Sequence, residues 1–135
     1  MIEEQYVSFE TAKLLKEKGF DEECIANYIV DVSIPHKASI NVYGLKHNNT
    51  DYLTYSDIRF ICAPTQQMTL RWLREMHNIP INVLYSRIYV HHYKFTCVTK
   101  KHEIGDAHRY DTYEQACEAA ILYCLKNLIK RRTEL

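Results

Sequence analysis

Glycine, proline and long apolar runs are scarce in this chain. Among 135 residues there are only 3 Gly and 3 Pro, which leaves little material for flexible linkers or for a glycine-rich loop that cradles phosphate. The motifs GxGxxG, GxxxxGK[ST] and GxSxG are absent from the sequence, and no apolar run approaches the ~20 residues that a membrane-spanning helix needs. The sequence therefore predicts one domain over residues 1–135, without a nucleotide-binding loop or a serine-hydrolase signature.

The chain also lacks a net charge. Its 17 Lys and Arg balance its 17 Asp and Glu, so no overall field favours nucleic acid or an acidic membrane surface. The balance hides a mild gradient, because residues 1–67 are net acidic and residues 68–135 are net basic.

The cysteines do not form a recognisable framework. There are 5 of them, an odd number, and no CxxC occurs. Cys117 and Cys124 lie seven positions apart on a predicted helix, so they share a face but cannot bond to each other. Reduced thiols in a cytosol fit this usage better than disulfides. The acidic start, Met1 to Gln5, has no apolar segment of the kind found in signal peptides, and we expect a cytoplasmic protein.

Three helices are predicted from their caps and their apolar spacing. Ser8 caps a helix that runs to about Lys18 and closes at Gly19. Thr65 caps a second helix that ends at His77, and a capping box at 112–115 opens a third helix that runs to Ile129. The apolar positions of the second helix are Met68, Trp72, Leu73 and Met76. Those of the third form a wide stripe, which predicts a helix lying across a sheet.

Alternating side chains predict strands between these helices. They lie at 24–32, 58–62, 81–85 and 89–99, with a less regular hairpin from 40–42 to 53–55 and a short extended piece at 107–110. The expected fold class is α+β: a single two-layer domain with an antiparallel sheet of about four to six strands and three helices, N-terminal, central and C-terminal.

Three blocks of the chain resemble small proteins, with no assigned activity, of gut Bacteroides-type bacteria and their phages. The blocks are Tyr6–Phe20, then Ala63–Gln66 with Trp72–His77, then Thr112–Ala116 with Cys124–Ile129. The resemblance covers nearly the whole chain in one order, and the segment 25–55 matches least. It implies an intracellular protein from a prophage or another mobile element, and it implies no activity.

Histidine and cysteine invite two catalytic hypotheses. Cys97, His102 and His108 could converge as three zinc ligands, but their spacing matches no metal motif, and exposed turn histidines are the commoner explanation. Cys62 precedes a helix N-terminus, where a thiol pKa can be lowered, but its alternation with Ile58 and Phe60 is typical of a small buried residue. We therefore expect no metal, no cofactor and no catalytic residue, although a Cys/His or metal-dependent hydrolase stays a third hypothesis.

Nucleic-acid binding is the second hypothesis. The candidate surface combines aromatic side chains that could stack on bases with cations that could contact phosphates. It consists of Tyr89, Tyr93, Phe95, Lys100, Lys101, Arg109, Arg131 and Arg132. Aromatic residues on one strand face are more often the core beneath a helix, and the zero net charge argues against backbone-driven binding.

A non-catalytic interaction protein is the leading hypothesis. The chain contains 11 Tyr, and Tyr, Met, Arg and Trp are enriched at protein interfaces. The partner would be another protein from host or phage, or a second copy of the chain bound through a sheet face or a free edge strand. No membrane partner is expected.

Overall fold

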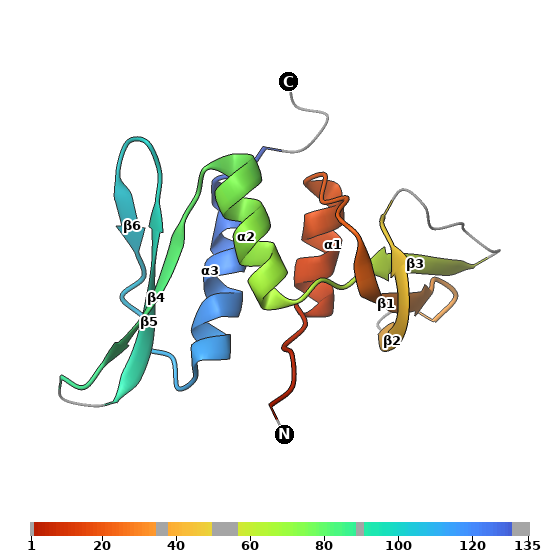
Figure 1. Ribbon diagram of the computed structural model, residues 1–135, viewed down its shortest axis with the longest axis horizontal. Coiled ribbons are helices and arrows are strands. Elements are labelled where there is room, and N and C mark those ends of the chain that lie inside the picture. The colour runs from red at the N-terminus through yellow and green to blue at the C-terminus, as the bar shows by residue number, and fades with distance from the viewer. Residues whose placement is uncertain (1, 35–37, 50–56, 89–90, 131–135) are drawn as a thin grey trace. The chain divides into compact units, whose positions relative to one another are not determined.

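The computed structural model describes residues 2–34, 38–49, 57–88 and 91–130. These residues divide into two compact units (Figure 1). The N-terminal unit consists of the described residues from Tyr6 to Pro64, with Lys130. The C-terminal unit runs from Thr65 to Ile129 and includes residues 2–5. Within the described ranges, none of the helices has the length and apolar character needed to cross a membrane.

The N-terminal unit is one helix with a three-stranded antiparallel sheet. Its elements are α1 (Phe9–Glu17), β1 (Cys24–Asp31), β2 (Ala38–His47) and β3 (Ile58–Cys62), and the strand order is β2-β1-β3. Helix α1 packs on β3. The buried apolar side chains of this unit are Val7, Ala12, Leu15, Phe20, Cys24, Ala26, Cys62 and Ala63.

Helix α1 begins and ends as predicted. The Ser8 hydroxyl accepts a hydrogen bond from the Thr11 amide at 3.2 Å, which satisfies an amide that the helix leaves unpaired. Gly19 has φ 91°, a left-handed conformation that an L-residue rarely adopts, and the Phe20 amide donates back to the Leu15 carbonyl at 2.9 Å.

Strand β2 has a partner that was not predicted from the sequence. The expected hairpin joined Ile40 and Val42 to the segment at 53–55, which lies outside the described residues. In the structure β2 pairs antiparallel with β1, and Ile40 lies opposite Tyr28. The side chain of Asn49, just beyond β2, accepts from the Cys62 amide at 3.0 Å and donates to the Phe20 carbonyl at 2.8 Å. One amide side chain thus connects β3 to the loop after α1.

The C-terminal unit stacks two helices and a second three-stranded sheet. Its elements are α2 (Gln66–His77), β4 (Ile81–Ser86), β5 (His92–Val98), β6 (Glu103–Gly105) and α3 (Tyr113–Asn127). The antiparallel strands have the order β4-β5-β6, α3 packs against β5 and β4, and α2 packs against α3 (Figure 1).

Helix α3 is the centre of this unit, and its wide apolar stripe lies across the sheet as predicted. Its buried residues are Ala116, Cys117, Ala120, Ile121, Cys124 and Leu125. The Thr112 hydroxyl caps the Gln115 amide at 3.1 Å. The capping box is a variant, because Gln115 Oε1 accepts from the Asp111 amide at 3.1 Å, one residue before the cap.

Helix α2 has the predicted caps and buries Trp72 and Leu73 as predicted, but the rest of its predicted stripe is exposed. Thr65 caps its start, and Asn78 closes it with φ 55°. Met68 and Met76, expected in the core, are 40% and 64% exposed. Gln66 is buried instead, because its side chain donates to the Glu114 carbonyl of α3 at 3.0 Å. The buried side of α2 is therefore partly polar, with Gln66 and Thr69 beside Trp72 and Leu73.

The α+β class and the antiparallel pairing are confirmed, but the strands form two sheets where one was expected. The long strand predicted at 89–99 is shorter, since β5 begins at His92 and residues 89 and 90 lie outside the described part. Strand β6 occupies the predicted turn at 100–106. The extended piece at 107–110 contributes a bridge between Tyr110 and Tyr93.

We predict that Phe95 supports the C-terminal core. Its side chain is 2% exposed, so Phe95→Ala should lower the free energy of unfolding by about 3–5 kcal/mol, whereas Lys100→Ala on the surface should change it by less than about 0.5 kcal/mol. Chemical denaturation measures both values. Phe95→Leu, with a smaller expected loss, keeps the comparison available if the alanine variant does not fold. Equal effects of the leucine variant and Lys100→Ala would contradict the assignment.

Candidate interaction surface

Strand β5 turns its aromatic side chains toward α3. Phe95 lies 6.1 Å from Tyr110 and 6.4 Å from Tyr123, measured between ring centroids, and Cys97 meets Cys124 of α3 with 3.4 Å between the sulfur atoms. The prediction that Phe95 belongs to an exposed stacking platform is therefore wrong. The ring is core because α3 covers this face of the strand.

Near the first turn of α3, the same face of β5 is only partly covered and carries a row of aromatic and histidine rings. Tyr93 is half-buried, 5.0 Å from the ring of Tyr85 and 6.4 Å from that of Tyr113. The Tyr85 hydroxyl is hydrogen-bonded to Nδ1 of His91, and the Tyr113 hydroxyl accepts from Gln67 at 3.2 Å. We call His91, Tyr85, Tyr93 and Tyr113 the ring row. Its mutual contacts fix the rings, so a partner would meet an ordered aromatic surface.

Strand β4 is an edge of its sheet, and its outward backbone groups can be assigned from the ladder. In an antiparallel pair, residues alternate between positions bonded to the neighbour and positions that point away. Tyr93 exchanges both backbone bonds with Tyr110, so Tyr85, which lies opposite Tyr93, directs its amide and carbonyl away from β5. By the same alternation, Ile81 and Val83 also point outward. No backbone bond joins these three residues to another described part of the chain.

The edge strand itself is free of charge, and the nearest charged side chains are Lys94, opposite Leu84 on the face away from α3, and Arg87, after the end of β4. Strand β4 reads Ile-Asn-Val-Leu-Tyr-Ser, without a lysine or an acid. Leu84 is 53%, Tyr85 50% and Ile88 70% exposed. Edge strands are commonly protected by charges, bulges or covering loops. An uncharged, exposed edge next to ordered rings is a surface suited to another polypeptide.

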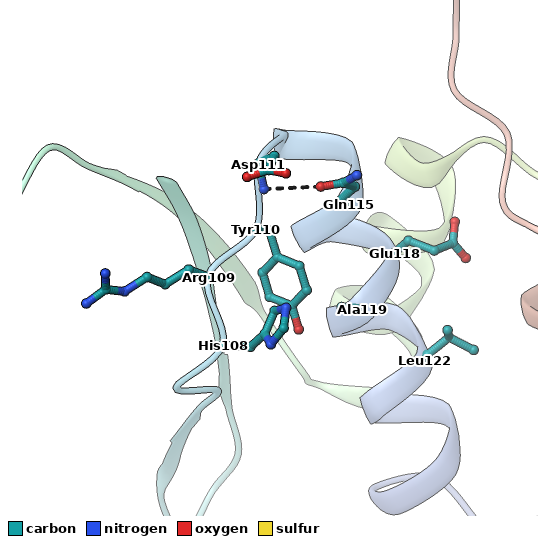
Figure 2. A pocket seen from close by; sticks show the side chains of 8 residues that line it. All are labelled: His108, Arg109, Tyr110, Asp111, Gln115, Glu118, Ala119 and Leu122. Carbon is teal, nitrogen blue, oxygen red and sulfur yellow. Dashed lines mark hydrogen bonds between the residues drawn. The ribbon is translucent and has the colours of Figure 1, made fainter. Parts of the chain in front are cut away.

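The three predicted cations that the structure describes do not share one surface with the rings. Lys100 and Lys101 are exposed in the turn between β5 and β6. Arg109 is exposed and points away from α3, on the opposite side of the chain from Tyr110 (Figure 2). Lys94 lies between the inward-facing Tyr93 and Phe95 and therefore also faces away from α3. Tyr89, Arg131 and Arg132 lie outside the described residues.

A shallow hollow of about 470 Å³ lies where the segment between β6 and α3 meets the side of that helix (Figure 2). It is lined by His108, Arg109, Tyr110, Asp111, Gln115, Glu118, Ala119 and Leu122. Burial and the hydrogen bond to Asp106, at 2.7 Å, raise the pKa of Tyr110 to about 12. That bond, with one from the His108 amide, lowers the pKa of Asp106. A neutral phenol and an ionised carboxylate at neutral pH stabilise the bend and are poorly poised for proton transfer.

The two catalytic hypotheses receive no support from the thiols. Cys97 is buried against Cys124, while His102 and His108 are exposed, so these three do not form a ligand set. In the part of the chain that the structure describes, no three His, Cys, Asp or Glu side chains are placed to hold a metal ion. Cys62 is buried and its sulfur contacts the His47 carbonyl at 3.6 Å.

The comparisons with known proteins are negative: no family model, no curated protein and no solved structure matches the chain. The candidate surface therefore rests on its geometry. Tyr93 was predicted from the sequence, whereas the exposure of Leu84, Tyr85 and Ile88 was not. The available signal was the absence of charge from Ile81 to Ser86, together with the position of this strand directly after Pro80.

We predict that no cysteine of the folded protein behaves as a nucleophile. All five are buried. The pKa of Cys24 is raised by its hydrogen bond with Cys62 and by burial, that of Cys124 by its hydrogen bond with Cys97 and by burial, and burial raises that of Cys117 to about 12. The hydrogen bond with Cys124 lowers the pKa of Cys97, but the Cys97 sulfur is buried like the other four. Because reagent cannot reach buried sulfur atoms, a colorimetric disulfide reagent should react slowly before unfolding and rapidly with five equivalents after it. Fast reaction of even one cysteine with the reagent in the folded protein would contradict this prediction.

Proposed function

We propose that the protein is a non-catalytic interaction protein that binds another polypeptide through β4 and the ring row. The observation that carries the proposal is the uncharged edge of β4, flanked by the exposed side chains of Leu84, Tyr85 and Ile88. The resemblance to small proteins of gut bacteria and their phages supports an intracellular origin in a mobile element.

Two kinds of interaction support binding at this surface. The outward amides and carbonyls of Ile81, Val83 and Tyr85 can receive an added strand, which supplies affinity without demanding a particular side chain. Tyr85 and its neighbours in the ring row offer large rings whose freedom is already restricted, so little further conformational entropy is lost on binding. Strand addition and aromatic contact therefore act side by side.

The proposal predicts a position-specific cross-link. A photoreactive benzoylphenylalanine at Ile88, beside the edge, should give a defined covalent product with a polypeptide when the protein is irradiated in its native host. The same group at Glu23, an exposed position of the N-terminal unit, is the matched control. Adding Tyr85→Ala to the Ile88 probe should lower the product by roughly tenfold, as expected for loss of an aromatic anchor. Mass spectrometry identifies the product.

Either of two results would count against the proposal. One is a yield at Ile88 that does not exceed the yield at Glu23. The other is a product that persists unchanged with Tyr85→Ala while circular dichroism reports a folded protein. A specific product supports the proposal whether it contains a second copy of the chain or a different protein.

Nucleic-acid association is the second candidate. It is favoured by the position of Lys94 and Arg109 on the side of the strands away from α3 and by Lys100 and Lys101 in the adjacent turn. Cations spread over one sheet and its turn could follow a phosphate backbone. Because Phe95 is core, this surface would lack the base-stacking platform that the sequence analysis expected.

This second candidate predicts salt-dependent binding to a single-stranded oligonucleotide, measured by fluorescence anisotropy. Lys100→Gln with Lys101→Gln should reduce the slope of log affinity against log salt by about 2. Arg71→Gln with Arg74→Gln on α2 removes the same charge elsewhere and should change the slope less. Equal slopes for the two double variants would remove this surface from consideration.

A further inference from the structure

The backbone of β4 also defines which partner fits it best. This inference rests on the proposed function, in which the partner adds a strand to β4. The backbone amides and carbonyls of that strand must meet those of Ile81, Val83 and Tyr85, which point away from β5 and alternate with residues bonded to β5. The chain itself contains such a strand, β4. We propose that the protein forms a symmetric homodimer in which β4 of one copy pairs antiparallel with β4 of the other, joining two three-stranded sheets into one of six strands.

The register of this pairing follows from the ladder. A two-fold axis through Val83 places Val83 opposite Val83 of the second copy and places Ile81 opposite Tyr85 in both directions. All three pairs are then hydrogen-bonded pairs, in which each residue exchanges an amide and a carbonyl bond with its opposite. An axis at Leu84 would also pair outward residues, Val83 with Tyr85, but it would leave Ile81 opposite the charged Arg87, beyond the end of β4. The run ends at Ile79, whose amide donates to the Leu73 carbonyl at 3.0 Å, and at the charged Arg87.

The side chains suit self-pairing. On the α3 side, the axis brings together two valines and two Ile–Tyr pairs, and aromatic–β-branched pairs are favourable across strands. On the other side, Asn82 meets Leu84. No like charges oppose each other, because β4 has none. A two-fold interface requires one patch to complement itself, and an uncharged strand with alternating outward groups meets this condition.

Amide hydrogen exchange on the unmodified protein tests the pairing directly. At low concentration the amides of Ile81, Val83 and Tyr85 should exchange quickly, while Leu84, which is bonded to β5, exchanges slowly. At high concentration the three outward amides should become protected, and light scattering should report twice the 16.0 kDa chain mass. A chain that stays monomeric, or a dimer whose outward amides remain unprotected, would overturn the proposal.

Variants of opposite charge at Val83 test the register of the pairing. Because the axis places residue 83 opposite itself, Val83→Lys should oppose two lysines and return the mass to that of the monomer, and Val83→Glu should do the same with two acids. Mixing the two variants should restore a dimer. Val83 is half-buried, so the restored dimer also demonstrates that both variants fold. Val42→Lys makes the same change at an exposed valine of β2, outside the proposed interface, and this control should remain dimeric. Dimers of Val83→Lys alone would contradict the register.

The failure of this inference is distinguishable from the failure of the proposed function. A monomer whose Ile88 probe still captures a different polypeptide overturns the homodimer and leaves the interaction surface in place. A monomer with no specific product at Ile88 contradicts both. A dimer with protected outward amides supports both.

Discussion

The burial of α3 against β5 is the contact on which the rest of the C-terminal unit depends. It makes one face of the strand core, with Phe95 and Cys97 beneath the helix, and it directs Lys94 outward. The sheet extends past the first turn of α3, where Tyr93 and Tyr85 are only partly covered. The same packing that creates the core therefore also creates the aromatic surface.

The parts of the fold that depend on local chemistry could be predicted from the sequence. Ser8, Thr65 and Thr112 cap the helices at the expected residues, and Gly19 and Asn78 end two of them with positive φ. These signals act within one turn of chain, so neighbouring residues contain the information. The wide stripe of α3 was equally informative, because a helix packed between a sheet and another helix must be apolar over more than one face.

What could not be predicted depends on contacts between distant segments. Nothing near Ile40 indicates that β2 pairs with β1, and nothing near Gln66 indicates the bond to the Glu114 carbonyl that buries it. The division of the strands into two sheets is of the same kind. For the candidate surface, alternation placed Tyr93 and Phe95 on one face correctly, but only the position of α3 decides that Phe95 is covered and Tyr85 is not.

An exposed, uncharged edge strand carries a risk of indiscriminate pairing, and the structure limits that risk. Only three residues of β4 point outward, since the amide of Ile79 is already bonded and Arg87 introduces a charge at the other end. So short a run offers few hydrogen bonds to an arbitrary strand, and an isolated pair of strands is marginal in water. Stable binding then requires additional contacts beside the edge, which the ring row and Ile88 are placed to make. A short edge with an adjacent aromatic anchor is thus selective in a way that a long edge is not.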